Sequence, residues 1–282
     1  MDFSGSDLAA ECGIGEGGGV RVQHASAGGC DILRVRVETQ EAAERIGKPK
    51  GRYVTLNFGN VCALDSREEE RICCAVSVEM REMARRICPK REGILGVLVA
   101  GLGNADMTAD ALGPQTVRML TVTRHLQREE RVLLSGTGSG ELSAVAPGVV
   151  GQTGMESAEL LRGVVQSIRP DLVIAVDALA ARSPDRLAAT VQLCDSGICP
   201  GSGVGRARGA LNAETLGVPV MAVGVPTVIR CDTLMADALG EKREDARCER
   251  LRELCVCPRE IDLVVLRAAR MLARAVERAF CQ

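Results

Sequence analysis

Short apolar stretches with the spacing of β-strands recur along the chain, separated by longer amphipathic stretches. Two of them alternate apolar and polar residues, as half-buried strands do, and three are nearly continuous, as fully buried strands are. The alternating segments are 32–37 and 53–58, and the continuous ones are 97–100, 172–176 and 218–225. We expect these five segments to be strands of one sheet.

Three further segments carry apolar residues at helical spacing. The first begins at Ser66 with Glu69 three residues later, the second begins at Thr153 with Glu156, and the third begins near residue 258. A hydroxyl residue followed three positions later by glutamate is typical of a capping box. Four residues lie off the apolar face of the third helix and are expected to face solvent: Arg267, Arg270, Arg274 and Arg278.

Strands that alternate with amphipathic helices indicate an α/β protein. The continuous apolar strands predict a central twisted sheet, mostly parallel or mixed, with helices on both faces. The chain contains no internal repeat and no linker that would separate two cores. We therefore expect a single α/β domain, with loops at the glycine-rich segments 15–19 and 28–29.

Composition excludes several classes of function. The chain has 282 residues and a net charge of −2, so it has no basic footprint for nucleic acid, and aromatic residues make up only 1% of it. Its apolar runs are far shorter than the ~20 residues of a membrane span. The N-terminus is acidic, unlike the basic start of a signal peptide. We expect a cytoplasmic protein without nucleic-acid or membrane partners.

Metal and thiol chemistry are disfavoured by the arrangement of the ligating residues. The 13 cysteines include no Cys-x-x-Cys pair, and only His24 and His125 could supply imidazole. We interpret the cysteines as small apolar residues in a reducing compartment and expect neither a metal nor a cofactor. His125 is equally well explained as a structural histidine or as a supporting residue of a catalytic site.

Two aspartates follow buried strands, where functional loops of α/β sheets lie. Asp177 ends the strand 172–176, and Asp110 lies in the loop after 97–100. Gly101 and Gly103 resemble the start of a dinucleotide-binding fingerprint, but Asp106 stands where its third glycine belongs, so a Rossmann site is disfavoured. A second glycine-rich loop, 201–205, lacks the lysine and hydroxyl of a phosphate loop and is interpreted as a substrate-contacting loop.

Several long motifs, in order along residues 52–230, resemble the germination protease of endospore-forming bacteria. They include Gly101-Leu-Gly-Asn104, Thr108-Ala-Asp-Ala-Leu-Gly-Pro114, Val122-Thr-Arg-His-Leu126, Val173-Ile-Ala-Val-Asp-Ala-Leu-Ala-Ala-Arg182, Asp195-Ser-Gly-Ile-Cys-Pro-Gly-Ser-Gly-Val-Gly205, Glu214-Thr-Leu-Gly-Val-Pro219 and Gly224-Val-Pro-Thr-Val228. Pro258-Arg-Glu-Ile-Asp262 resembles the start of that family's last helix. The match is poor at the N-terminus, at 105–107 and at 231–257.

This resemblance implies an endopeptidase that degrades small acid-soluble spore proteins in the forespore or spore core. It also implies a self-processing zymogen, a homotetramer, and a phosphorylase/hydrolase-like fold shared with hydrogenase maturation proteases. The two carboxylates of that fold's active site map onto Asp110 and Asp177. Two facing carboxyls share one proton, so one can activate water while the other polarises the scissile carbonyl. Asn104 is expected to orient this pair.

Two other functions stay open at this point. A metal-dependent peptidase of the maturation type would bind its ion through Asp110 and Asp177 with a histidine from elsewhere. A catalytically silent binding protein of the same fold would be free to lose either aspartate, and this chain retains both. Asp106, as a loop or capping acid, and Asp171, as an acid at a strand start, serve as controls without a catalytic role.

The N-terminal sequence contains a short match to the cleavage sites that the resemblance implies. Ser6-Asp7-Leu8-Ala9-Ala10-Glu11 has an acid, an apolar residue, a small residue and a second acid in order. We expect residues 1–8 to be a propeptide, cut between Leu8 and Ala9, and residues 9–282 to form the peptidase domain. We also expect this segment to be an exposed, mobile tail, and a plain disordered tail is the alternative.

Overall fold

A computed structural model of the chain describes residues 6–12, 17–89, 95–126, 129–130, 140–205, 208–239 and 250–281. In this part of the chain, nine strands form one mixed sheet in the order β1-β2-β3-β7-β8-β6-β4-β5, and β9 pairs with β8 outside this path. The strands are β1 (Val20–Ala27), β2 (Cys30–Val37), β3 (Gly51–Asn57), β4 (Gly96–Gly101), β5 (Glu141–Val145), β6 (Leu172–Ala181), β7 (Thr190–Cys194), β8 (Val220–Arg230) and β9 (Cys255–Val256). The five predicted strands are β2, β3, β4, β6 and β8.

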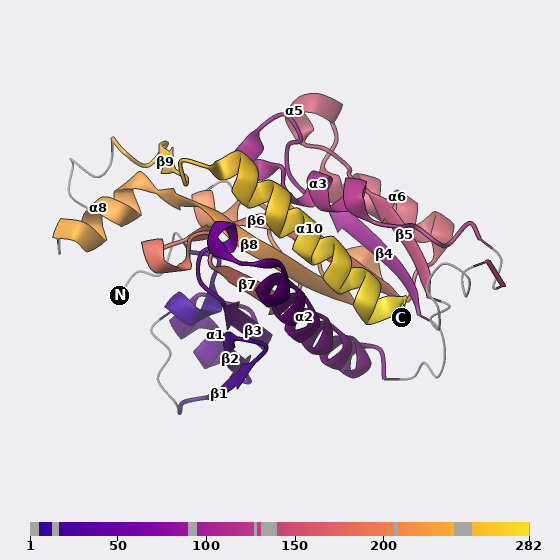
Figure 1. Cartoon of the computed structure of the whole chain (residues 1–282), viewed down its shortest axis with the longest axis horizontal. Coiled ribbons are helices and arrows are strands. Elements are labelled where there is room, and N and C mark those ends of the chain that lie inside the picture. The colour runs from indigo at the N-terminus through magenta and orange to yellow at the C-terminus, as the bar shows by residue number, and fades with distance from the viewer. Residues whose placement is uncertain are drawn as a thin grey trace.

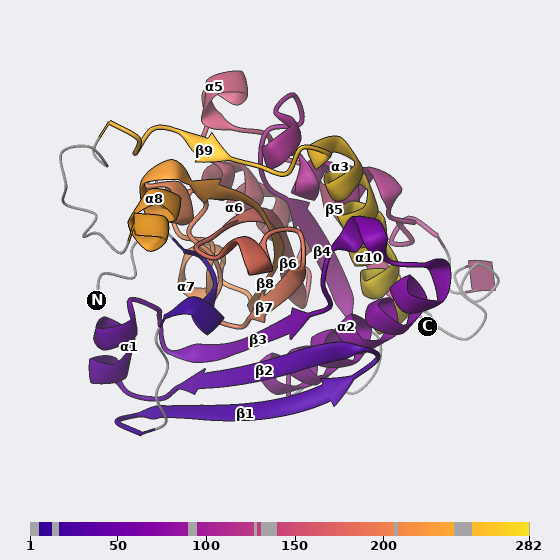
Figure 2. The same ribbon diagram turned by 60° about the vertical axis from the view of Figure 1, so that its left-hand side comes forward.

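The sheet has a parallel half and an antiparallel half. Strands β5, β4, β6 and β8 run parallel to one another, whereas β7, β3, β2 and β1 follow as antiparallel neighbours. Figure 2 shows the antiparallel strands β1, β2 and β3 as a curved layer beside the parallel core. The predicted single α/β domain with a mixed sheet is therefore confirmed.

Helices cover both faces of this sheet. They are α1 (Gln40–Ile46), α2 (Ser66–Ile87), α3 (Leu112–Met119), α5 (Val150–Thr153), α6 (Ser157–Ile168), α7 (Ala213–Leu216), α8 (Cys231–Leu239) and α10 (Ile261–Phe280). Helices α2, α3 and α10 share the main apolar core with one face of the sheet, and Figure 1 shows α10 and α2 side by side there. Helices α6 and α7 pack on the opposite face.

Short 3₁₀ turns connect these elements. They are η1 (Ala9–Glu11), η2 (Val61–Ala63), η3 (Thr108–Asp110), η4 (Pro184–Arg186) and η5 (Ser202–Val204). Gly28 and Gly29, expected in a loop, form the two-residue turn of the β1–β2 hairpin with φ of 64° and 84°. Both central residues of such a turn need positive φ, which glycine adopts without strain. Part of the other expected loop, residues 15–16, lies outside the described residues.

The two predicted capping boxes are each displaced. Helix α2 is capped by Asp65, whose side chain accepts from the backbone of Glu68, while Glu68 accepts from the Asp65 backbone. Helix α6 is capped in the same way by Glu156 and Glu159, and the expected cap Thr153 instead ends α5. The expected caps are wrong because an acidic residue at a neighbouring position satisfies the free N–H groups of each helix.

The arginines of α10 do not all face solvent as expected. Arg267 donates to the backbone oxygens of Cys62 and Leu64 and to Glu69 of α2. Arg274 and Arg278 both pair with Glu70 of α2. Arg270 and Arg274 are exposed as expected, whereas Arg267 and Arg278 are partly buried. Ion pairs therefore connect the polar edge of α10 to α2, and we call these pairs, Arg267–Glu69, Arg274–Glu70 and Arg278–Glu70, the seam.

Candidate active site

Asp177 lies inside β6, on the face of the sheet that α6 and α7 cover. Its side chain is only 5% exposed, and it accepts a hydrogen bond from the backbone N–H of Ala178 at 3.0 Å. Gly224 is its neighbour on β8, where a Cβ would stand 2.5 Å from the Asp177 carbonyl oxygen. Burial raises the pKa of Asp177 well above its usual range, and the negative charges of Asp110 and Asp7 add to this effect.

Asp110 ends η3, in the connection between β4 and α3. Its carboxylate accepts from the backbone N–H of Asn104 at 2.7 Å. Gly103 has a φ of +106°, and a Cβ there would stand 2.0 Å from the Asp110 carbonyl oxygen. The hydroxyl of Thr227 on β8 donates to the Ala109 carbonyl at 2.7 Å and fixes the turn from the other side. The position of Asp110 is thus set by backbone contacts.

The two aspartates meet because β4 and β6 are parallel neighbours. Gly101 pairs with Val176, and the N–H of Leu102 donates to the Val176 carbonyl at 2.8 Å, so β4 ends beside the position of Asp177. Burial also raises the pKa of Asp110, but the Asn104 N–H and the positive charge of Arg208 oppose the shift. Asp177 therefore keeps its proton more readily, and Asp110 ionises more readily.

The other predicted site residues lie in different places. Asn104 contacts Asp110 through its backbone, whereas its side-chain oxygen accepts from Asp106 N–H and from Gln152. His125 is exposed in the turn before β5. The backbones of its neighbours Thr123 and Arg124 donate to the Leu142 carbonyl, near the amino end of the parallel strands. The structure does not bring His125 to the aspartate pair.

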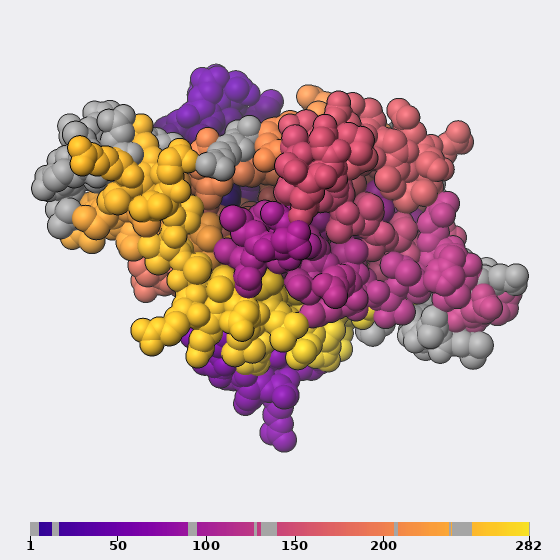
Figure 3. All heavy atoms as spheres, turned by 90° about the horizontal axis from the view of Figure 1, so that it is seen from above, coloured from indigo at the N-terminus to yellow at the C-terminus, as the bar shows by residue number. Residues whose placement is uncertain are grey.

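The two control aspartates have structural partners. Asp106 accepts from the side-chain amide of Gln152 at 2.8 Å, and Asp171 accepts from the backbone N–H of Gly96 at 2.8 Å. Figure 3 shows the loop after β4 at the molecular surface, beside the segment that carries α5 and α6. Met107 of this loop is 59% exposed, so the loop that carries Asp110 is accessible to solvent.

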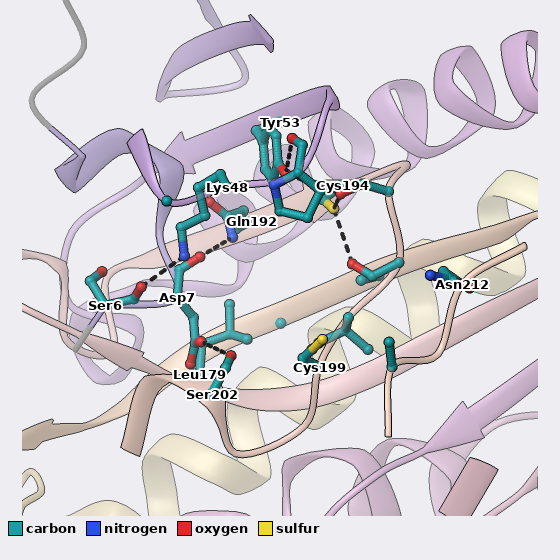
Figure 4. Close-up of a pocket in the computed structure, with 18 of the residues that line it drawn as sticks. Ser6, Asp7, Lys48, Tyr53, Leu179, Gln192, Cys194, Cys199, Ser202 and Asn212 are labelled. Carbon is teal, nitrogen blue, oxygen red and sulfur yellow. Dashed lines mark hydrogen bonds between the residues drawn. The ribbon is translucent and has the colours of Figure 1, made fainter. Parts of the chain in front are cut away.

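A cavity of about 640 Å³ extends across the same face of the sheet from β6 to β3. The residues that line it include Leu179, Gly224, Gln192, Tyr53, Asp7 and Lys48. Figure 4 shows the Asp7 side chain pointing to Ser202, with Lys48 and Gln192 on the other side of Asp7. Gln192 and Lys48 could not be singled out from the sequence, because isolated polar residues on a strand and in a loop carry no motif.

The expectation of an exposed, mobile segment around the Leu8–Ala9 bond is wrong. Both residues are fully buried, and η1 starts at Ala9. The polar residues that suggested a solvated tail bind the body of the protein instead. Glu11, for example, accepts from the backbone N–H groups of Arg182 and Ser183 at 2.7 and 2.8 Å. The position of the expected cleavage is a docked segment beside β6.

The side chains near Asp110 and Asp177 that could bind a metal ion are carboxylates. Among the residues that the structure describes, no group of three or more histidines, cysteines or acids is arranged to hold a metal ion. The twelve cysteines within the described ranges are all reduced thiols. The acidic groups of this site within the described residues are Asp110 and Asp177, with Asp7 close enough for its charge to act on Asp177.

Comparison with known proteins agrees with the resemblance of the sequence motifs. A model of the family described as germination protease matches residues 9–241. The chain belongs to the germination protease family. It is 37% identical to the germination protease of Clostridium acetobutylicum over 98% of this chain and 94% of that protein. It is also 42% identical to that of Priestia megaterium, over 78% of this chain and 59% of that protein.

Membership of the germination protease family makes this chain a peptidase that acts in spore germination. One solved structure with a detectable likeness is a [NiFe] hydrogenase maturation protease from Thermococcus kodakarensis. It is 17% identical, covers 66% of this chain and 95% of its own, and has a TM-score of 0.36. Within the residues that the structure describes, no helix has the length and apolarity that crossing a bilayer demands.

Proposed function

We propose that this germination protease is an endopeptidase that degrades small acid-soluble spore proteins by activating water between Asp110 and Asp177. Family membership supports the peptidase activity. The observation that carries the mechanism is the nearness of two carboxyls, Asp110 in the turn after β4 and Asp177 within the neighbouring strand β6, where Asp177 is 5% exposed and has a strongly raised pKa. Perturbed carboxyls that influence one another are typical of acid–base catalysis.

In the first step, the ionised Asp110 accepts a proton from water, and the oxygen of that water attacks the scissile carbonyl carbon. Protonated Asp177 donates a hydrogen bond to the carbonyl oxygen and stabilises the negative charge that develops there. The product of this step is a tetrahedral intermediate, with the water proton held on Asp110.

In the second step, the carbon–nitrogen bond breaks and Asp110 returns its proton to the leaving nitrogen. The carbonyl re-forms as a carboxylic acid, Asp177 keeps its own proton, and Asp110 is again ionised. One water has been added across the peptide bond, without a covalent intermediate on the enzyme. The difference between the two carboxyls is what assigns the base role to Asp110 and the acid role to Asp177.

Activation is proposed to remove residues 1–8 by cleavage between Leu8 and Ala9. Asp7 is close enough to Asp177 for its charge to raise the Asp177 pKa, which supports a link between this segment and the site. Because Leu8 and Ala9 are fully buried, cleavage requires that the segment first detaches. The homotetramer and the location in the forespore or spore core are proposed from the resemblance of the motifs.

The deciding experiment is an incubation of the purified chain with a small acid-soluble spore protein, followed by mass analysis of the products. We expect defined internal cleavages at an unchanged rate after exhaustive treatment with a chelator. Loss of cleavage with chelator and recovery with a divalent ion would instead support the metal-dependent alternative. Binding of the spore protein without cleavage would support the silent binding protein.

A further inference from the structure

Three arginines lie directly opposite one another across the antiparallel half of the sheet. Arg21 of β1 is the register partner of Arg36 of β2, and Arg36 is the register partner of Arg52 of β3. Neighbouring strands lie about 4.8 Å apart, and like charges directly opposite on one face destabilise a sheet. We call Arg21, Arg36 and Arg52 the arginine row. Such a row is stabilised by negative charge placed beside it.

The arginine row lies on the face of the sheet opposite to that of Asp177. Side chains alternate between the two faces along a strand, so Arg52 shares a face with Val54 and Leu56, which pack in the core that includes α2. Tyr53 points to the other face, in a second core cluster, and lines the cavity of about 640 Å³. Figure 2 shows α2 beside the layer of β1, β2 and β3. The arginine row is therefore separate from the candidate active site.

A groove of about 630 Å³ is lined by the arginine row and by residues of the last turns of α2. Arg34 of β2 and Arg86 of α2 also line it, which brings the arginines of the groove to five. Two acids, Glu79 and Glu82 of α2, are among the lining residues. The groove therefore has more positive than negative side chains on its walls.

Part of this positive charge is balanced within the chain. Arg34 donates two hydrogen bonds to Glu79. Glu38, the residue after β2, pairs with Arg21 at 3.1 Å and with Arg36 at 3.2 Å. One carboxylate therefore serves two guanidinium groups of the arginine row, and their charges are only partly balanced.

Arg52 has the least balanced charge in the groove. Among the residues that the structure describes, no acid forms an ion pair with its side chain, and Asp195 instead accepts from its backbone N–H at 2.7 Å. Burial and the positive charges of Arg86 and Arg36 lower the pKa of Arg52, although Asp195 and Glu82 oppose this shift. A half-buried guanidinium that is repelled by its neighbours is stabilised when an anion binds between them.

We propose that this groove binds a small polyvalent oxyanion, whose acidic oxygens bridge Arg36, Arg52 and Arg86. Polyphosphates and polycarboxylates share this chemistry, because the planar guanidinium group binds phosphate or carboxylate through paired N–H donors. A volume of about 630 Å³ is in the range of small-molecule sites. The net charge of −2 gives the chain no extended basic surface of the kind that nucleic acid needs. The proposal does not depend on the function of the aspartate pair.

Binding is tested by isothermal titration calorimetry of the full chain at low salt, with tripolyphosphate and, separately, with citrate. We expect one anion per chain, with a Kd of about 10–100 µM for at least one of the two. Arg52→Gln should weaken this binding about tenfold or more, because charged donors are lost. Arg270→Gln removes the same charge from the exposed side of α10, outside the groove, and should leave the Kd unchanged.

The two anions distinguish the sources of the bound group. At least about tenfold tighter binding of tripolyphosphate supports a phosphate ligand, and the reverse order supports a carboxylate ligand. Equal affinities, both lost in Arg52→Gln, support a site that recognises the charged oxygens of either. If neither anion binds more tightly than acetate at the same ionic strength, the proposal is overturned. It is also overturned if Arg270→Gln weakens binding as much as Arg52→Gln does.

The unfolding temperature separates anion binding from a structural role of Arg52. Without added anion, Arg52→Gln should unfold at or slightly above the temperature of the unsubstituted chain, because repulsion within the arginine row is reduced and no ion pair is lost. At about 100 times its Kd, the anion should raise the unfolding temperature of the unsubstituted chain by about 5 °C. The same concentration should raise that of Arg52→Gln by no more than about half as much.

A second variant keeps the test independent of how Arg52→Gln folds. Arg86→Gln alters a side chain on the opposite wall of the groove that is 51% exposed and pairs with Glu82 at 3.6 Å, so its removal should leave the fold intact. It should also weaken anion binding about tenfold. Unchanged binding and an unchanged thermal response in the folded Arg86→Gln and Arg52→Gln proteins would overturn the proposal.

Discussion

At the residue scale, the proposed mechanism depends on the unequal surroundings of two aspartates. The sequence pattern places Asp110 in the loop after one buried strand and Asp177 at the end of another, where a carboxylate without a role is costly, and the family resemblance implies that the two form a pair. It does not predict which of them keeps the proton. That difference comes from the backbone N–H of Asn104 and the charge of Arg208 near Asp110, and from deeper burial of Asp177.

The raised pKa of Asp177 predicts a pH-dependent stability. A folded-state pKa above the unfolded value means that the folded protein binds the proton more tightly. This stabilisation is complete below the ordinary carboxyl pKa and is lost as the pH rises through the raised value. Asp177→Asn should therefore unfold at a higher temperature than the unsubstituted protein at neutral to alkaline pH, with the gap closing toward acid pH, as measured by calorimetry.

The matched control for this stability measurement is Asp171→Asn, which alters a carboxylate that accepts from Gly96. It should not become more stable at alkaline pH. A lower unfolding temperature for Asp177→Asn throughout this pH range would show that Asp177 is ionised and favourably paired in the folded protein. The assignment of Asp177 as the proton holder would then fail.

Gly103 gives a second prediction at this scale. Its φ of +106° and the 2.0 Å approach of the Asp110 carbonyl to a Cβ exclude a side chain. Gly103→Ala should lower the free energy of unfolding by about 2 kcal/mol and reduce cleavage severely. Gly151→Ala, where no atom lies within 4 Å of the added Cβ, should leave both nearly unchanged. Denaturant titration and an activity assay decide between these outcomes.

At the element scale, the parallel half of the sheet was easier to predict from the sequence than the antiparallel half. Strands β4, β6 and β8 are buried on both faces and read as apolar runs. Strand β1 is an edge strand with mostly exposed side chains, and β7 contains the buried polar residues Thr190 and Gln192, so neither has the expected pattern. Pairing across the sheet stabilises these strands where their own sequence does not.

The seam between α10 and α2 gives the prediction at this scale. Arg267 makes three hydrogen bonds around the start of α2, and its side chain is 19% exposed. Arg267→Ala should lower the free energy of unfolding by about 2 kcal/mol, because two backbone oxygens and Glu69 lose a charged donor. Arg270→Ala, on the exposed side of α10, should change it by less than about 0.5 kcal/mol. Equal effects in urea titrations would contradict this role for the seam.

At the scale of the whole molecule, the N-terminal segment joins the first residues of the chain to the middle of the sheet. Its sequence is polar and short, which is why it was expected to be mobile. The groups that hold it, including Gln192, Ala180 and Arg182, are far away in sequence. Such long-range contacts cannot be predicted from the local sequence pattern. Because of them, the segment is buried against the sheet and is not a free tail.

Processing between Leu8 and Ala9 should therefore be limited by detachment of this segment. Lys48 donates from Nζ to the Ser6 carbonyl at 2.8 Å and helps to hold it. Lys48→Met should make detachment easier by about 1 kcal/mol and accelerate processing about fivefold. Lys50→Met, which alters an exposed neighbour, should have no effect. Intact-mass measurements over time give both rates, and equal rates would count against detachment as the limiting step.

The proposed joint activation of water by Asp110 and Asp177 is tested most directly by the cleavage rate of single asparagine variants. Asp110→Asn and Asp177→Asn should each reduce cleavage of a small acid-soluble spore protein by about 10³-fold or more while remaining folded. Asp106→Asn, in the same loop as Asp110, should retain most of the activity. Near-normal cleavage by the folded Asp177→Asn or Asp110→Asn protein would contradict this mechanism.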